Sequence, residues 1–289
     1  MTADAPKIEP RLVGGNRGMR WLGSAATYVV LIGAALLTLA PFVLAVLTAF
    51  QEPRQFSSQG VSLPLPPTIE NFVALGERRV SFGEAAAVTV GVVALVTVGQ
   101  LLFSIMAAFA FARLRFPGRN LLFWVFLSTL MVPQVVTVIP LYFMMSEAGF
   151  GGEFWGLVLP FLFGSPYAVF LLREQFRQIP QELVDAMRID GSGTWGILFG
   201  LVVPLSRSTI VTLLLITVVS HWNNFMWPLM IGQNRIHVLT TATASLQEQY
   251  SNNTTLVMAA SVLAMLPLIV LFVIFQKQIV RSIRISGFR

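Results

Sequence analysis

Acidic and basic side chains are concentrated in one short segment of this chain. In ELVDAMRIDGSG, Glu182, Asp185, Arg188 and Asp190 follow one another closely, although only 11% of the whole sequence is charged. Carboxylates and a guanidinium can form charge-assisted hydrogen bonds with a partner molecule. Side chains of this kind make the segment a candidate docking surface for another protein.

The same segment is predicted to fold as a short helix. Pro180 suits the first turn, where its missing N–H costs nothing, and Gly191 suits the position just beyond the end. Between them Leu183, Ala186 and Met187 follow helical spacing, with Asp190 one step further, which predicts a small apolar face topped by a carboxylate.

A second helix is predicted directly after this turn. Ser192 or Thr194 can cap it, and it should cover residues 195–203, ahead of Pro204. The alternative without a protein partner is an amphipathic helix that lies on the lipid headgroups. Because acidic residues outnumber Arg188 on its polar face, we favour a protein partner.

A second group of polar residues interrupts otherwise apolar stretches. Aromatic rings stack on the C–H faces of sugars and amides pair with hydroxyls, so these side chains are candidates for a solute path. The alternative for each is an ordinary interhelical hydrogen bond. The candidates are Gln134, Tyr142, His221, Trp222, Asn223 and Asn224.

Other chemistry is poorly supported. A phosphate-binding loop needs Gly-Lys-Ser/Thr after a glycine-rich turn, but the two lysines, Lys7 and Lys277, follow Pro6 and Gln276. There is no cysteine, and neither of the two histidines has carboxylates at metal-ligand spacing. We expect no bound cofactor, no metal and no ATP hydrolysis by this chain.

The composition indicates a membrane protein. Over 289 residues, 55% are hydrophobic and the mean hydropathy is +0.75, whereas soluble domains carry about a quarter charged residues. The net charge of +6 then reflects basic cytoplasmic loops rather than nucleic-acid binding. Since the deficit of charge runs along the whole chain, we predict an all-α polytopic membrane protein.

Six uncharged runs are long enough to cross a bilayer as helices. The polar stretch 1–20 should be a cytoplasmic tail followed by a retained first span rather than a signal peptide. Within the outer loop 51–83, SLPLPPTIENF should be extended and then enter a short helix. The predicted spans are 21–50, 85–112, 120–146, 154–172, 208–234 and 249–276, in a permease domain 21–281 followed by a tail 282–289.

Basic residues set the predicted orientation. With both termini in the cytoplasm, 15 of the 19 basic residues lie inside and four, Arg54, Arg78, Arg79 and Arg235, lie outside. This bias is the positive-inside pattern. The charged segment 180–205 is then cytoplasmic, between spans four and five.

Several separated motifs resemble one family. IPQELVDAMRIDGSGTWGILFGLVVPL is similar to the signature loop of the permeases of ABC importers, which usually has Glu where Asp185 stands and Ala where Met187 stands. MVPQVVTVIPLYFMM (131–145), HWNNFMWPLMI (221–231) and LVMAASVLAMLPLIVLFVIFQKQIV (256–280) resemble the maltose-type branch. The resemblance covers residues from about 70 to 281.

The resemblance implies an alternating-access importer for a sugar or sugar-like solute in the inner membrane of a bacterium. It implies four kinds of partner: a second related permease, two copies of a cytoplasmic ATPase that holds ATP and Mg, an extracytoplasmic solute-binding protein, and membrane lipid. The loop 180–205 would then contain the coupling helix. The residues implied to contact the ATPase are Glu182, Leu183, Asp185, Ala186, Met187, Arg188, Asp190 and Gly191.

Three further alternatives are considered. Glycerol-phosphate importers share the fold, so the solute class is not fixed. An ion-coupled secondary transporter would carry acidic or basic groups inside its spans, but none of the 13 acidic residues lies within a predicted span, Glu84 being at an edge. A membrane-embedded enzyme would need a cluster of acids, bases or metal ligands, and none stands out.

Overall fold

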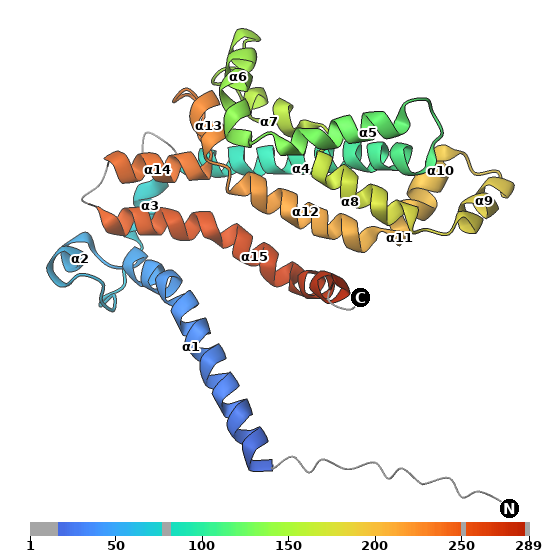
Figure 1. Ribbon diagram of the computed structural model, residues 1–289. Helices are drawn as coiled ribbons and strands as arrows, with labels where there is room; N and C mark the ends of the chain where they lie inside the picture. Colours follow the sequence, from blue (N-terminus) through green and yellow to red (C-terminus); the bar gives the residue numbers. More distant parts are fainter. Residues whose placement is uncertain (1–16, 77–81, 250–252, 287–289) are drawn as a thin grey trace, which may run out of the picture.

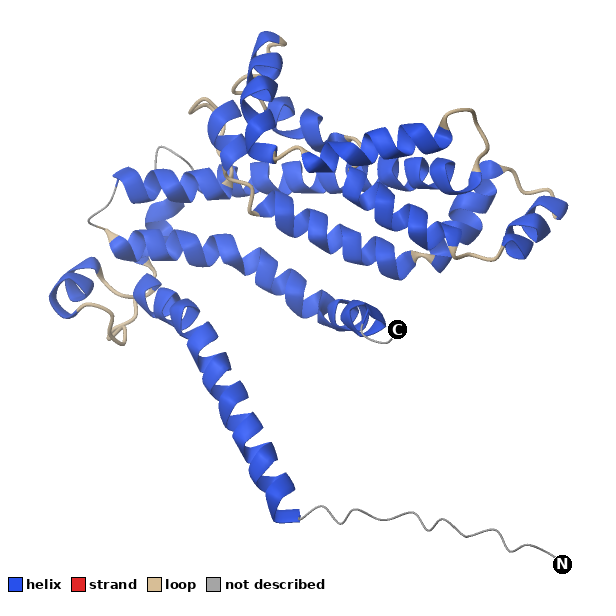
Figure 2. Cartoon of the chain, in the orientation of Figure 1, coloured by secondary structure: helices blue, strands red, loops and turns tan. Residues whose placement is uncertain are grey.

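The computed structural model describes residues 17–76, 82–249 and 253–286. Every regular element in these ranges is a helix, as Figure 2 shows. The helices, in chain order, are α1 (Arg17–Ala49), α2 (Pro53–Gln59), α3 (Glu70–Gly76), α4 (Phe82–Arg113), α5 (Arg119–Ser128), η1 (Thr129–Met131), α6 (Gln134–Glu147), α7 (Phe154–Leu162), α8 (Pro166–Arg177), α9 (Gln181–Ile189), α10 (Thr194–Ile197), η2 (Leu198–Val202), α11 (Val203–Leu205), α12 (Arg207–Trp222), α13 (Met226–Ile231), α14 (Leu239–Gln249) and α15 (Thr254–Ser286).

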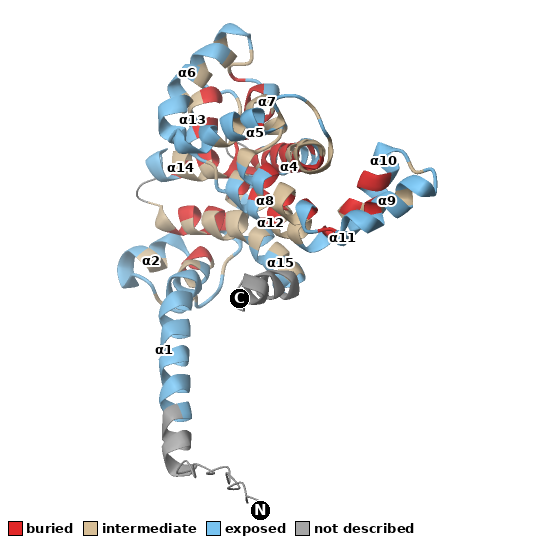
Figure 3. Cartoon of the chain, turned by 45° about the vertical axis from the view of Figure 1, so that its right-hand side comes forward, coloured by how far each residue is buried: buried red, intermediate tan, exposed pale blue. Residues whose placement is uncertain are grey.

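Helix α4 is the centre of the fold. Its buried side chains contribute to three apolar clusters, one shared with α5, α8, α9 and α12, one with α3, α14 and α15, and one with α7 and α13. Figure 3 shows the buried residues gathered along α4 and the helices around it. A helix that is apolar on all sides is expected at such a central position.

The segments between the long helices gather at two opposite ends of the molecule. In Figure 1, α2, α3 and α14 lie at one end, and α9, α10 and α11 project from the other. The predicted short helix after the proline-rich loop is confirmed as α3, whereas α2 was not predicted.

Four helical segments are long and apolar enough to cross a membrane. They are Ser24–Ala49, Phe82–Arg113, Phe154–Arg177 and Thr254–Gln276. Two bent pairs raise the possible number of spans to six, by length and composition. The all-α polytopic class is confirmed, and four to six spans is the range that these helices support.

The predicted continuous span 120–146 is instead two helical parts. The segments Arg119–Met131 and Gln134–Glu147 are bent by 101°. Val132 has an extended backbone (φ −82°, ψ 117°) because it precedes Pro133, whose ring disfavours helical geometry at the residue before it. The apolar run in the sequence predicts burial in lipid but does not distinguish a kink from a break.

The predicted span 208–234 also divides. Helix α12 ends at Trp222, and α13 begins at Met226 after the turn at Asn223 and Asn224. On its other side α12 follows Thr194–Leu205 at a bend of 80°. The second helix of the charged loop, predicted over 195–203, is α10 continued by the π-helical turn η2 and by α11.

The ends of the permease domain also differ from prediction. Helix α1 begins at Arg17, and residues 1–16 of the predicted tail lie outside the described residues. Gln249, the first residue of the predicted sixth span, is the last residue of α14, and α15 begins at Thr254. Helix α15 continues to Ser286, so most of the predicted tail 282–289 is helical.

Candidate functional site

The charged segment folds as a helix that ends in a tight turn. Helix α9 runs from Gln181 to Ile189, one residue later than predicted, with Pro180 as its N-terminal cap. Gly191 has φ +82°. The Gly191 N–H donates to the carbonyl of Arg188 (3.0 Å) and the Ser192 N–H donates to that of Met187 (2.9 Å). This pair of bonds is the Schellman motif, which requires a left-handed residue at the Gly191 position.

The apolar contacts of α9 differ from the predicted face. Val184 is buried in the cluster that contains Phe176, Ile179 and Ile197, and Met187 packs against the same cluster. Leu183 and Ala186, which were predicted to share an apolar face with Met187, are exposed within this chain. Val184 determines the rotation of the helix, because it fits the space that α8 and α10 leave between them.

An apolar surface is therefore left exposed on this loop. Ile189 is 86% exposed, and Trp195 and Phe199 are 58% and 46% exposed. The rings of Trp195 and Phe199 are stacked, with centroids 6.0 Å apart and an interplanar angle of 11°. Exposed apolar groups rimmed by charges are typical of a surface that a partner covers. These three residues were not predicted, although helical periodicity beyond Asp190 could have identified Trp195 and Phe199.

The charged side chains of α9 are exposed and linked along the helix. Asp185 accepts a hydrogen bond from the Gln181 amide (Nε2 to Oδ1, 3.0 Å) and forms an ion pair with Arg188 (Nη1 to Oδ1, 3.4 Å). Glu182 and Asp190 are also exposed. An exposed pair of this kind adds little stability, so these charges are available for a partner.

The six predicted path residues do not form one cluster. Gln134 is exposed at the start of α6, and Tyr142, further along α6, accepts a hydrogen bond from the Gln233 amide (3.3 Å). Asn223 is exposed and bonds back to the carbonyl of Val219 (2.8 Å). Trp222 is buried on the opposite side, where its indole donates to the carbonyl of Ala264 on α15 (3.0 Å).

His221 and Asn224 do come together. Both line a narrow crevice with Phe161 and Trp227. The His221 ring lies 5.3 Å from the Phe161 ring, and the side-chain oxygen of Asn224 accepts from the backbone N–H of Trp227 (3.4 Å). Of the six predicted residues, His221 and Asn224 are the two that lie beside the aromatic rings of this crevice.

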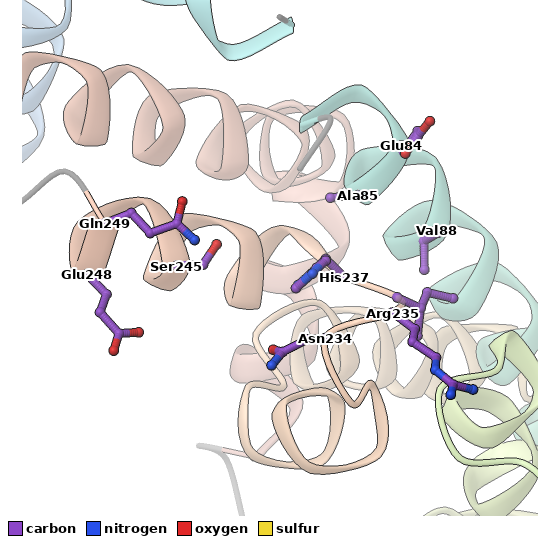
Figure 4. Close-up of a pocket in the computed structure, with 10 residues that line it drawn as sticks. Glu84, Ala85, Val88, Asn234, Arg235, His237, Ser245, Glu248 and Gln249 are labelled. Carbon is purple, nitrogen blue, oxygen red and sulfur yellow. The ribbon is translucent and has the colours of Figure 1, made fainter. Parts of the chain in front are cut away.

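A larger open cavity of about 710 Å³ lies at the end of the molecule opposite α9. Figure 4 shows polar and charged side chains around it from α4, the loop before α14, and α14 itself. Glu84, Arg235 and Glu248 are among them. Residue type and spacing do not associate these side chains, because they are far apart in the chain. Among the described residues, no group of three or more His, Cys, Asp or Glu side chains is arranged to hold a metal ion.

Comparison with known proteins identifies relatives along most of the chain. Residues 100–285 match the family model described as "Binding-protein-dependent transport system inner membrane component". The arabinooligosaccharides transport system permease protein AraQ of Halalkalibacterium halodurans is 30% identical over 261 residues, which are 88% of this chain and 92% of that protein. The sn-glycerol-3-phosphate transport system permease protein UgpE of Yersinia pestis is 31% identical over 267 residues, 89% and 94% of the two chains.

A solved structure has the same fold. It is a crystal structure of a bacterial ABC transporter involved in the import of the acidic polysaccharide alginate. The TM-score is 0.77 with 22% sequence identity, covering 91% of this chain and 98% of that one.

Proposed function

The chain belongs to the family of inner-membrane components of binding-protein-dependent transport systems, and on that premise we propose how it couples to its partners and what it carries. As a member of this family it is a multi-pass permease subunit of an ABC importer. We propose that ATP is hydrolysed by a separate ATPase, present in two copies, and that a second permease and an extracytoplasmic binding protein complete the importer.

The coupling residues are proposed to be those of α9 and its turn. The observation that carries this proposal is the exposed surface of the loop 180–205, which presents acidic side chains and Arg188 together with Ile189 and the stacked Trp195 and Phe199. A stiff helix fixed by Val184 and by the Gly191 turn can transmit a displacement that a flexible loop would absorb. Glu182, Leu183, Asp185, Ala186, Arg188 and Asp190 are its exposed contact residues, Met187 packs against the cluster beneath them, and Gly191 forms the exposed turn.

The proposed solute is a sugar or a sugar-like molecule. The similarity to an arabinooligosaccharide permease supports it. The crevice at His221 and Asn224 has a volume of only about 10 Å³, so a sugar can pass these residues only if the surrounding helices move apart. A glycerol-phosphate-type solute is the second candidate, favoured by the similarity to UgpE. The structural similarity to the alginate importer supports the fold alone, because the sequence identity is low.

The first experiment is a co-purification. Native membranes containing the C-terminally tagged chain are solubilised gently, and the proteins that accompany it are identified by mass spectrometry. Recovery of an ATPase with a phosphate-binding loop and of a second permease is expected. Recovery of this chain alone in several mild detergents would contradict the proposal.

The same preparation leads to the solute. A solute-binding protein that accompanies the complex, or that is encoded beside it, is screened by thermal shift against oligosaccharides, monosaccharides and sn-glycerol-3-phosphate. Stabilisation by a saccharide supports the first candidate, whereas stabilisation by glycerol phosphate alone supports the second.

A further inference from the structure

Arg113, the last residue of α4, reaches across to the loop 180–205. The side chain is half-buried and lies at the end of the molecule from which α9 projects. One terminal nitrogen, Nη2, donates to the backbone carbonyls of Phe176 and Ile179. The other, Nη1, donates to the side-chain oxygen of Gln181 (2.9 Å).

These three acceptors belong to three successive parts of the chain. Phe176 is in the last turn of α8, Ile179 is in the linker, and Gln181 is the first residue of α9. The last carbonyls of a helix lack intrahelical partners and carry partial negative charge, so a guanidinium is favourable there. A single side chain thus ties the end of α8 and the start of α9 to α4.

The bonds continue beyond Gln181 onto the exposed face of α9. The Gln181 side chain accepts from Arg113 through its oxygen and donates to Asp185 through its amide nitrogen (3.0 Å). Asp185 in turn pairs with Arg188 (3.4 Å). A row of polar contacts therefore leads from the end of α4 to the charged residues proposed to meet the ATPase.

At their other end, these polar contacts begin at Arg113 of α4, the central helix of the molecule. Upstream of Arg113, α4 buries Ile105, Ala108 and Phe109 in the cluster that also holds Val184 of α9. Nearer its N-terminus, α4 packs against α7, α13 and α15. A displacement of α9 that is transferred to α4 therefore reaches most of the spans.

We propose that Arg113 is the positioning residue that fixes the coupling helix to α4, so that a displacement of α9 moves the spans. The inference rests on the proposed function of α9. A guanidinium holds these donors on two nitrogens in one fixed plane, whereas a lysine carries its three donors on a single nitrogen at the end of a flexible stem.

The test compares Arg113→Ala, Arg113→Lys and Gln181→Ala with wild type in the purified complex with its ATPase. Deuterium uptake is measured for peptides covering 181–189 and 105–113, before and after addition of ATP, Mg and vanadate. In wild type, the nucleotide is expected to change uptake in both peptides. In Arg113→Ala, the change at 181–189 should remain while the change at 105–113 falls at least twofold.

Arg113→Lys should resemble Arg113→Ala, and Gln181→Ala should lie between Arg113→Ala and wild type, because it removes one of the three acceptors. Arg115→Ala is the matched control, since Arg115 is exposed, follows Arg113 by two residues, and carries the same charge. A nucleotide-dependent change at 105–113 that survives in Arg113→Ala would overturn the inference. Equal loss in Arg115→Ala would also overturn it, because charge alone would then account for the effect.

Failure of the inference is distinct from failure of the proposed function. If wild type recovers no ATPase, the proposed function fails. If wild type recovers the ATPase and the Arg113 variants respond to nucleotide as wild type does, only the role of Arg113 fails. ATP hydrolysis per complex provides a second measurement, in which Arg113→Ala should retain hydrolysis with at least a twofold weaker response to the loaded binding protein.

Discussion

At the scale of single residues, the turn after α9 depends on Gly191. Its φ of +82° lies in the region where L-residues are strained by about 1–2 kcal/mol. Nothing lies within 4 Å of where its Cβ would stand, so the requirement for glycine comes from the backbone alone. Gly193, two residues later, has φ −72° and equally open surroundings.

This contrast gives the first prediction. Gly191→Pro should abolish ATPase docking while membrane insertion remains normal, because proline fixes φ near −65° and removes the N–H that donates to Arg188. Gly193→Pro is the matched control, since its backbone already has a φ that proline accepts. ATP hydrolysis by the complex and co-purified ATPase are the measurements. Wild-type docking by Gly191→Pro would refute the proposed role of this turn.

The second prediction concerns Ile189, whose side chain is 86% exposed. If the ATPase covers it, Ile189→Glu loses about 1.5–3 kcal/mol of apolar burial, which corresponds to docking weaker by about 10- to 100-fold. The fold should be unaffected because the side chain has little contact with its own chain. The measurement is the amount of ATPase recovered per permease at increasing dilution.

Leu63→Glu is the control for Ile189→Glu, since Leu63 is 65% exposed in the loop at the opposite end. It should retain the ATPase fully. If Ile189→Glu retains it equally, the apolar part of the proposed docking surface is wrong.

At the scale of helices, the packing of α4 against α7 depends on a close approach at Gly99. A Cβ at this position would stand 2.7 Å from the backbone carbonyl oxygen of Leu162 and as near to the Leu162 side chain. Leu162 is the last residue of α7, just before the break at which Ser104 of α4 accepts a hydrogen bond from the Ser165 N–H (3.0 Å). The Ser104 hydroxyl therefore provides a hydrogen-bond partner for a backbone N–H at the break between α7 and α8.

The third prediction follows from this contact. Gly99→Leu should destabilise the fold by about 1–3 kcal/mol through overpacking, which lowers the amount of chain in the membrane and its unfolding temperature in detergent. Gly33→Leu on α1 has nothing within 4 Å and is the control. Equal stability of the two variants would contradict the close approach of α4 and α7.

At the scale of the whole molecule, α1 stands apart from the other helices along most of its length (Figure 1). The segment Ser24–Ala49 has a mean hydropathy of 2.6, and none of its most apolar stretch is buried within the chain. Such a surface is stable only in contact with lipid or with another membrane protein. Its end near Ala49 packs into the cluster shared with α3 and α15.

The fourth prediction is the orientation of the two ends. The basic-residue bias predicts that the loop with α9 is cytoplasmic and that α2 is outside. Because the chain has no cysteine, Ser58→Cys on α2 and Gly193→Cys report on each end separately. A membrane-impermeant maleimide applied to spheroplasts should label Cys at 58, and label Cys at 193 only after permeabilisation. The reverse pattern would invert the proposed topology.

The amino-acid sequence by itself determined the class of the protein and the position of the charged helix along the chain. Long uncharged runs must be helical in lipid because every backbone polar group needs a partner there, and the pattern around Gly191 specifies a helix end through backbone geometry. Both are local properties, which is why Pro180, Gly191 and the short helix α3 could be placed closely from residue type and spacing.

Only the tertiary structure decided which side chains meet. Val184 rather than Leu183 is buried in α9 because the space between α8 and α10 fixes the rotation of the helix. Trp222 packs on α15 while His221, its neighbour in sequence, faces the crevice. The bonds from Arg113 to Phe176, Ile179 and Gln181 join residues more than 60 positions apart. Periodicity cannot predict such contacts, because they depend on how separate helices pack against each other and not on the conformation of any one of them.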